Sequence, residues 1–397
     1  MSATVSGTAT GESPTVPGLR WALMFGNFVI GCGVMSVAGT LNNLADSLQV
    51  SVSLAGQLIT IGAVVMCLGA PLLAGWVAGF DRRRLLAFAL LWFAAGHALC
   101  ALMPSYAALW PVRTATLLGA AVFSPQAAAA IGFMTPPAQR GRAITFIFLG
   151  WSVASVLGMP MASWVGETFG WRSAFGVIAV LSLLGAVWVY RALPDGIRPA
   201  ALSLRAWKDV FTNPVLMAIV AVTAMQSAGQ FTLFSYMAPY YRLTLGATPA
   251  QISLLFAWFG VFGLVGNVLL TRHIDRVGTN FAVLLAMALI ALSLVAWPMG
   301  ASFGTMLLVI IPWGLGCFAA NSAQQARLSM AAPLLAPAMM ALNTSAMYLG
   351  QAAGAAGGGW LVAHGGYSPL HWVGAAWLAA AMALSLWAAG RTSRVTA

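Results

Sequence analysis

Residues 150–175 read GWSVASVLGMPMASWVGETFGWRSAF. This stretch carries a small residue at every fourth position, namely Gly150, Ala154, Gly158, Ala162 and Gly166. Residues four apart share one face of a helix, so these positions form a smooth stripe. Such a stripe lets the backbones of two helices approach closely. In lipid this close packing drives helix association, because the hydrophobic effect does not. The stretch therefore predicts a membrane-spanning helix that packs tightly against a neighbour.

The composition of the whole chain agrees with a lipid environment. Of 397 residues, 61% are hydrophobic and only 6% are charged, whereas soluble domains carry about 25% charged residues. Only helices and closed barrels satisfy their backbone polar groups within lipid. The apolar runs reach roughly 20 residues, which is helix length rather than the roughly 10 of a barrel strand. We therefore expect an all-α membrane protein.

The apolar runs also predict how the chain is divided. Twelve transmembrane helices are expected at about 20–43, 54–78, 85–103, 106–133, 142–166, 172–192, 214–241, 250–272, 279–299, 303–329, 337–363 and 369–389. The predicted domains are a disordered cytoplasmic tail (1–18), two six-helix bundles (19–193 and 214–390), a cytoplasmic linker (194–213) and a second tail (391–397). The first tail lacks the basic and apolar regions of a signal peptide.

The distribution of positive charge predicts the topology. All Lys and Arg residues except Arg113, Arg172 and Arg242 lie on the side of the N-terminus. Cytoplasmic loops carry such an excess, so both termini are expected in the cytoplasm and the chain in the inner membrane. The net charge of +11 is spread over short connections. A nucleic-acid binder gathers its charge into a patch, so we expect no nucleic-acid partner.

The two halves repeat one another at nearly constant spacing. Four residues recur 194 positions later, namely Gln57, Gly69, Asp81 and Arg82 as Gln251, Gly263, Asp275 and Arg276. Three more recur 200 positions later, namely Leu149, Gly150 and Gly158 as Leu349, Gly350 and Gly358. The series predicts a duplicated six-helix unit. Two similar bundles around a central site can rock and expose that site to each side in turn.

Two motifs in the opening stretch carry a family resemblance. The tripeptide Gly158-Met159-Pro160 and FGWR at residues 169–172 resemble the fifth-helix signature of exporters of the major facilitator superfamily. Within that superfamily the chain resembles the bacterial drug and sugar efflux branch of proton antiporters, over about residues 20–390. The resemblance implies that the fifth and eleventh helices line the seam between the halves. Its expected conformational residues are Gly150, Gly158, Pro160, Gly350, Gly354 and Gly358; the alternative is ordinary packing within each half.

The loop after the second predicted helix resembles the cytoplasmic D-R-x-G-R motif of the same family. It reads Asp81-Arg82-Arg83-Arg84, with Arg84 where glycine is expected, and its second copy begins Asp275-Arg276. The resemblance implies a latch that holds the outward-facing state. A carboxylate beside the N-terminus of a neighbouring helix meets the positive end of its dipole. The alternative is that these arginines only set the topology.

Arg113 lies within the fourth predicted helix and matches the arginine of a family motif, although Leu117 replaces the usual glycine. A charge at membrane depth is costly, so a role in binding substrate or in proton movement is the default; the alternative is a structural hydrogen-bond hub. The relatives' acidic residue in helix one is absent from Gly31-Cys32-Gly33-Val34. His97 and Arg113 are then the candidates for proton coupling. A carrier that uses no proton is the alternative.

The resemblance implies a central cavity lined by helices one, four, seven and ten, with contributions from five, eight and eleven. Amides, aromatic rings and one arginine at mid-depth predict a neutral or weakly anionic organic substrate. The candidate substrate-binding residues are Asn27, Arg113, Gln126, Gln226, Gln230, Tyr236, Trp313, Asn321, Asn343, Tyr348 and Gln351. For any one of them, a hydrogen bond between helices is the alternative.

These patterns predict a secondary active transporter that exports a small organic molecule in exchange for protons. The alternatives are a proton-independent uniporter or importer of a neutral metabolite and, more remotely, a membrane sensor or intramembrane enzyme. The sequence contains no H-E-x-x-H motif and no paired catalytic carboxylates at membrane depth, and its one G-x-S-x-G match, at residues 300–304, falls at a predicted connection. We therefore expect no enzyme activity. The four cysteines lack metal-ligand spacing, so neither metal nor cofactor is expected. The partners expected are lipid, substrate and protons, and the protein is expected to be a monomer.

Overall fold

A computed structural model describes residues 18–392 except 51 and 199–203, and all its regular elements in those ranges are helices. The long helices of the first half are α1 (Leu19–Gly39), α3 (Val52–Val77), α4 (Arg82–Leu102), α5 (Tyr106–Met134), α6 (Arg140–Val153) continued by α7 (Met159–Phe169), and α8 (Trp171–Ala192). Those of the second half are α10 (Pro214–Phe234), α12 (Pro249–Val277), α13 (Thr279–Val295), α14 (Phe303–Ala331), α15 (Ala336–Gly365) and α16 (Leu370–Thr392). The twelve predicted spans are confirmed.

Length and apolar composition suit these helices to a membrane. Ten helices in the described ranges are long and apolar enough to cross a bilayer, and α13 is a shorter apolar helix. Large side chains such as Leu72 and Trp76 are mostly exposed on their outer surfaces. An apolar outer surface is stable only where lipid replaces water.

Three short helices were not predicted as separate elements. Helix α2 (Leu41–Leu48) follows a break at Thr40, and α11 (Met237–Thr244) follows α10 after a turn. The predicted linker contains α9 (Leu204–Thr212), which was not expected. The predicted tail before residue 18, and residues 199–203 of the linker, lie outside the described residues. The domain boundaries themselves stay a prediction.

The fifth spanning segment is not a continuous α-helix. Residues Ala154–Gly158 form a π-helical turn between α6 and α7. Pro160 has no backbone N–H to offer the carbonyl of residue 156, and such a gap in the ladder is where helices widen or bend. The segment therefore changes its winding where its two parts join.

Local geometry explains why the two copies of the D-R-x-G motif differ. Gly278 has a φ of 81° in the tight turn between α12 and α13, a conformation that side chains with a Cβ rarely adopt. Arg84, its counterpart, lies within the first turn of α4, where no positive φ is needed. The missing glycine in the first copy is thus a consequence of where the following helix begins.

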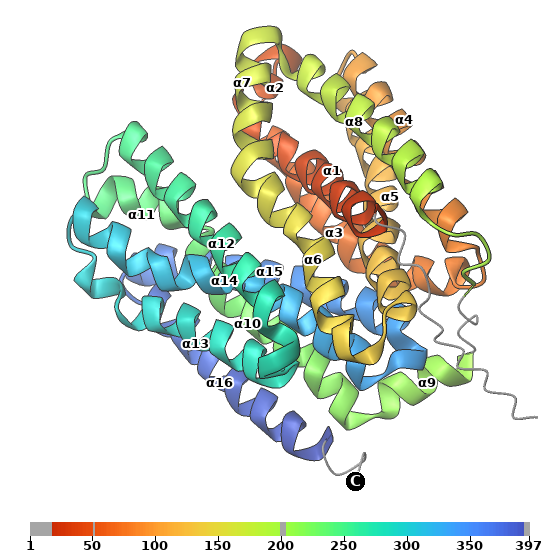
Figure 1. Ribbon diagram of the computed structural model, residues 1–397. Helices are drawn as coiled ribbons and strands as arrows, with labels where there is room; N and C mark the ends of the chain where they lie inside the picture. The colour runs from red at the N-terminus through yellow and green to blue at the C-terminus, as the bar shows by residue number, and fades with distance from the viewer. Residues whose placement is uncertain (1–17, 51, 199–203, 393–397) are drawn as a thin grey trace, which may run out of the picture.

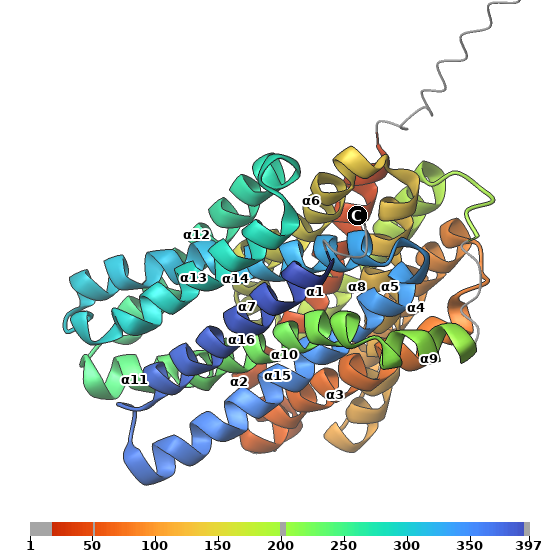
Figure 2. The same ribbon diagram turned by 90° about the horizontal axis from the view of Figure 1, so that it is seen from below.

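The helices form two bundles, α1–α8 and α10–α16, that contact each other along two seams. Helix α6 packs against α12 and α14, and α15 packs against α3 and α5. Figure 1 shows the bundles close together near α9 and the beginning of α6, whereas α7 and α11, at the opposite end, lie apart. Figure 2 shows α15, α3 and α9 together from below. We call the end that carries α9 the linker face.

Candidate functional site

A network of uncharged polar side chains runs between α10, α14 and α15, and we call it the polar ladder. Thr223 donates to Asn343 Oδ1 at 2.6 Å, and Trp313 Nε1 donates to Gln230 Oε1 at 3.1 Å. Asn343 Nδ2 lies 3.4 Å from Asn321 Oδ1. The ladder therefore consists of two hydrogen-bonded groups along α10, and together they contain four of the predicted substrate residues, from three helices.

Gln324 and Thr223 complete this ladder and were not among the predicted site residues. Gln324 Nε2 donates to Thr223 Oγ1 at 3.0 Å and to the Ile219 carbonyl at 2.9 Å. Thr223 could have been recognised, because it lies three residues before Gln226 and seven before Gln230 on one face of the helix. Gln324 had no such signal, since it depends on how α14 packs.

Four buried glutamines among the described residues have side-chain carbonyl oxygens that lack a hydrogen-bond partner. They are Gln126 on α5, Gln226 on α10, and Gln324 and Gln325 on α14. At most 2% of each residue is exposed. A buried carbonyl that stays unpaired costs about 1–3 kcal/mol. These oxygens are therefore acceptors that the protein's own described groups leave unpaired.

A second polar cluster lies in the first bundle between α1, α5 and α6. Ser124 donates to Asn27 Oδ1 at 2.7 Å, and Asn27 Nδ2 donates to the Ile147 carbonyl at 3.1 Å. Trp151, which is partly exposed, donates through Nε1 to Ser124 Oγ at 3.3 Å. Sequence analysis selected Asn27 alone, because Ser124 and Trp151 become its neighbours only through packing.

Arg113 is fully buried within the first bundle and makes two directed hydrogen bonds. Its Nη1 lies 2.9 Å from His97 Nε2, and its Nη2 donates to the Gly33 carbonyl at 2.7 Å. His97 Nδ1 lies 2.9 Å from the Phe93 carbonyl. The two proton-coupling candidates are therefore in direct contact, and Arg113 links α4 to α1. This geometry matches the hydrogen-bond hub that sequence analysis kept as the alternative to substrate contact.

The remaining predicted substrate residues lie outside both clusters. Tyr236 donates to the Ala355 carbonyl at 2.7 Å and so ties the turn between α10 and α11 to α15. Tyr348 is buried and Gln351 is partly exposed on α15. The structure gives none of these three a hydrogen bond to the ladder among the described contacts.

The glycine stripes pack within each bundle. A Cβ on Gly150 would overlap the Met24 carbonyl of α1, and one on Gly158 would meet Cys32 of the same helix. In the second bundle, Cβ atoms on Gly350, Gly354 and Gly358 would overlap carbonyls of α10. The stripes thus bring α6–α7 onto α1 and α15 onto α10. The stripes therefore serve packing within each bundle, the alternative to a role at the seam. Helices α6 and α15 also make contacts across the seams, with α12 and α14 and with α3 and α5.

Two hydrogen bonds cross the seam between α6 and α12. Asn267 Nδ2 donates to Ser152 Oγ at 2.8 Å, and both residues are fully buried. Nearer the linker face, Asp275 Oδ1 accepts from the backbone N–H of Arg142 at 3.0 Å, in the first turn of α6. The carboxylate of the second motif copy therefore lies at the N-terminus of a neighbouring helix, as expected from the positive end of the helix dipole.

The first copy of the motif does not cross a seam. Asp81 accepts from the backbone of Arg84 at 3.2 Å and from Gly196 N at 2.8 Å, so it caps its own helix and holds the start of the linker. Arg82 donates to the carbonyls of Val77 and Phe80 in the same loop. Arg276 is exposed. A latch role for either copy stays a prediction.

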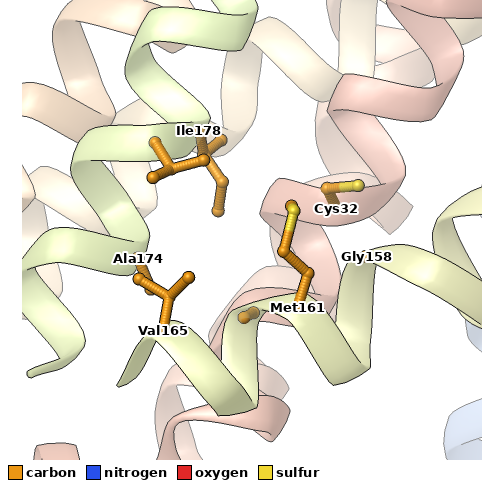
Figure 3. A pocket seen from close by; sticks show the side chains of 8 residues that line it. Cys32, Gly158, Met161, Val165, Ala174 and Ile178 are labelled. Carbon is orange, nitrogen blue, oxygen red and sulfur yellow. The ribbon is translucent and has the colours of Figure 1, made fainter. Parts of the chain in front are cut away.

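A small recess between α1, α7 and α8 is apolar. Figure 3 shows Cys32, Met161, Val165 and Ile178 around it. Such a lining offers almost no polar contact to a ligand, so we do not assign the recess a substrate. Within the described residues, no group of His, Cys, Asp or Glu has a metal-binding arrangement.

Two bundles of six spans, with polar groups inside and apolar groups outside, define a secondary transporter. The profile of the Major Facilitator Superfamily matches residues 23–334 and 220–396, and the chain belongs to this family. It is a multi-pass membrane transporter and not an enzyme.

Curated relatives of the chain come from several bacteria. It is 31% identical over 370 residues to the "Inner membrane transport protein YdhP" of Escherichia coli strain K12, covering 92% of this chain and 94% of that protein. It is 28% identical over 355 residues to a "Probable sugar efflux transporter" of Mannheimia succiniciproducens, covering 89% of each. It is 33% identical over 273 residues to a "Chloramphenicol resistance protein" of Streptomyces lividans, covering 68% and 69%.

Solved structures share the fold at low identity. The proton:xylose symporter XylE bound to 6-bromo-6-deoxy-D-glucose has a TM-score of 0.73 and 19% identity, covering 94% of this chain and 95% of its own. The human organic anion transporter MFSD10 has a TM-score of 0.76 and 15% identity, covering 94% and 100%. These likenesses confirm the predicted architecture of two related six-helix bundles.

Proposed function

We propose that the chain exports a small neutral organic molecule across the inner membrane by alternating access, in exchange for protons. The bundles 19–193 and 214–390 would move as two units about a central site. The observation that carries the proposal is the uncharged polar ladder, together with the unpaired carbonyl of Gln226, which lies between Thr223 and Gln230 on α10. Pairing this carbonyl with a substrate donor would remove an energetic cost that the empty site bears.

The chemistry of the open positions narrows the substrate class. The unpaired carbonyls of Gln126, Gln226, Gln324 and Gln325 can only accept hydrogen bonds, so a fitting substrate carries hydroxyl or N–H donors. Among the described residues, Arg113 is engaged by His97 and Gly33, and the buried Arg327 of α14 is engaged by Ser385, so hydrogen bonds within the protein hold both of these cations. The names of two relatives, a sugar efflux transporter and a chloramphenicol resistance protein, support a neutral, hydroxylated substrate.

Transport by the purified protein in proteoliposomes tests this function. Radiolabelled chloramphenicol and glucose serve as probes, with an imposed pH gradient of either sign. We expect at least one probe to accumulate against its concentration gradient on the side from which protons leave. Gln226→Leu should abolish this accumulation, whereas Gln57→Leu, an exposed position on α3 outside the candidate set, should leave it unchanged. Accumulation that ignores the sign of the pH gradient would contradict proton exchange.

One observation favours the second candidate, a proton-independent uniporter. The six acidic residues in the described part of the chain lie in connections, in short helices or near helix ends, and none of these six lies in the middle of a span. Proton-driven carriers usually hold the proton on a titratable group inside the membrane. Uniport predicts equal rates of entry and exit without uphill accumulation, so the same proteoliposomes distinguish the two functions.

A further inference from the structure

We propose that His97 takes up the transported proton on its Nε2 atom and that this step releases Arg113 from its hold on α1. The inference rests on the proposed exchange of substrate for protons. It assigns the coupling to a histidine–arginine contact, because no carboxylate lies at mid-depth in the spans that the structure describes. The argument starts from the donors and acceptors around the imidazole.

The contacts of His97 fix its tautomer. The Phe93 carbonyl can only accept, so the Nδ1 atom 2.9 Å away must carry the hydrogen. The guanidinium of Arg113 can only donate, so the Nε2 atom 2.9 Å from its Nη1 must present a lone pair. The imidazole in this arrangement is neutral, with its proton on Nδ1. Its one remaining basic site is the atom that Arg113 occupies.

Proton uptake at this site therefore cannot leave the contact intact. A proton from solvent would form a new N–H bond at Nε2, and Arg113 would keep all of its own hydrogens. Two donors would then face each other at hydrogen-bond distance, on two cations inside the bundle. Repulsion between like charges is strong where water is excluded. Arg113 Nη1 must move away for His97 to be charged.

No neighbouring group in the described structure compensates for the second charge. The thiol of Cys100 on α4 lies near Arg113 and contacts Thr116 Oγ1 at 3.8 Å. From α1 the neighbour is the Gly33 carbonyl, and from α8 it is the ring of Phe175, 5.6 Å from the imidazole. Neither of these titrates. The titratable and charged groups around His97 are thus Arg113 and Cys100.

Displacement of Arg113 acts directly on α1. Arg113 Nη2 donates to the Gly33 carbonyl at 2.7 Å, and Gly33 lies against the imidazole, because a Cβ there would come within 3.0 Å of His97 Cε1. Asn27 of the amide cluster lies six residues before Gly33 on the same helix, about 9 Å along its axis. One helix therefore connects the proton site to polar groups at the predicted substrate depth.

The other three histidines provide matched controls within the chain. His273 and His364 each place Nδ1 within 2.9 Å of the carbonyl four residues earlier, as His97 does, but both are exposed. His371 contacts the Leu294 carbonyl at 3.0 Å. None of these three has an arginine on Nε2 among the described contacts. A response that belongs to the pair should disappear in His97→Gln and persist in His364→Gln.

Hydrogen–deuterium exchange of the purified protein, without any substrate, tests the inference. Exchange is compared between about pH 8 and about pH 5.5, corrected for the intrinsic effect of pH on amide exchange. We expect acid to speed exchange several-fold in wild-type peptides that contain Gly33 and Arg113. His97→Gln retains an acceptor for Arg113 but carries no proton, so its exchange should not respond to acid. His364→Gln should behave as the wild type.

An acid response that survives in His97→Gln, or a wild type that does not respond, would overturn the inference. If His97→Gln does not fold, nitrogen NMR of the wild type supplies a second test. The His97 signals, assigned by difference from His273→Gln, His364→Gln and His371→Gln, should show the Nδ1–H form at about pH 8. A hydrogen on Nε2 at that pH would overturn it equally. If His97→Gln accumulates the probe in response to a pH gradient as strongly as the wild type does, His97 is rejected as the proton site. The proposed exchange of substrate for protons would still stand.

Discussion

At the scale of single residues, the contact between Asn267 and Ser152 has the clearest mechanical meaning. It is a side-chain hydrogen bond between fully buried groups of different bundles. In alternating access these bundles must separate along part of their seam. The contact can exist in one arrangement and not in the other, so it biases the equilibrium between them.

Removing this hydrogen bond should favour separation of the bundles at the linker face. Inter-helix hydrogen bonds in membranes contribute about 0.6 kcal/mol on average, so Ser152→Ala should raise the open population roughly three-fold. Spin labels at the exposed positions Gly79 and Asn280, in cysteine-free protein, would report the distance between the bundles. Ser155→Ala is the control, because its hydroxyl donates to the Ser152 carbonyl of its own helix. Equal effects of both variants would contradict this account.

At the scale of elements, α9 joins parts of both bundles. Trp207 packs against Ala70 and Ala74 of α3 and against Ala341 of α15, which are buried together. Preceding residues of the linker bind the first bundle, since Asp81 accepts from Gly196 N and Arg83 pairs with Asp195 at 3.8 Å. The linker thus follows the first bundle and then lies across the seam between α3 and α15.

Loss of the Trp207 ring should weaken the seam at the linker face. The half-buried indole loses apolar contact in Trp207→Ala, at a cost of about 2 kcal/mol, below the 3–5 kcal/mol of a fully buried site. The same spin-label pair should then show a larger open population. Phe211→Ala, whose ring stacks on Trp207 but is 55% exposed, should have a smaller effect. An unchanged distance distribution in Trp207→Ala would show that α9 does not hold the seam.

The close approach of α10 and α15 requires glycines on α15. A side chain on Gly354 would overlap the Ala228 backbone, whereas Gly357 on the same helix has nothing within 4 Å of the Cβ position. Overpacking costs about 1–3 kcal/mol or more when backbone must move. Gly354→Val should therefore lower the melting temperature by several degrees, and Gly357→Val should not. Similar melting curves for both would refute tight packing at this crossing.

At the scale of the whole molecule, the arrangement of the bundles gives a definite state. They meet near the linker face and their opposite ends lie apart (Figure 1). The predicted topology places the linker face in the cytoplasm, which makes this arrangement the outward-facing one. That placement depends on where the positive charges lie and is open to direct measurement.

Reporter fusions would measure the topology. Green fluorescent protein attached after residue 397 should fluoresce, and alkaline phosphatase inserted in the connection between α11 and α12 should be active. Both outcomes follow from the excess of Lys and Arg on the side of the termini. An active phosphatase at the C-terminus would reverse the topology and make the structure inward-facing.

Sequence by itself determined the spans and their duplication. Lipid excludes unpaired backbone groups, so each run of about 20 apolar residues such as the one in α10 must be a helix regardless of its neighbours. The same local logic found Arg113 and His97, because polar residues inside apolar runs are visible without a structure. It also found the glycine stripes, but it could not say which helix each stripe would contact.

The tertiary structure alone decided the partners. Sequence cannot show that Asn267 reaches Ser152, that Asp275 rather than Asp81 crosses a seam, or that Trp207 fits between two helices of different bundles. The physical reason is that helix packing in lipid depends on the fit of small surfaces and a few polar contacts, which are set by rotations and crossings of whole helices. These are relations between distant segments, and no local pattern contains them.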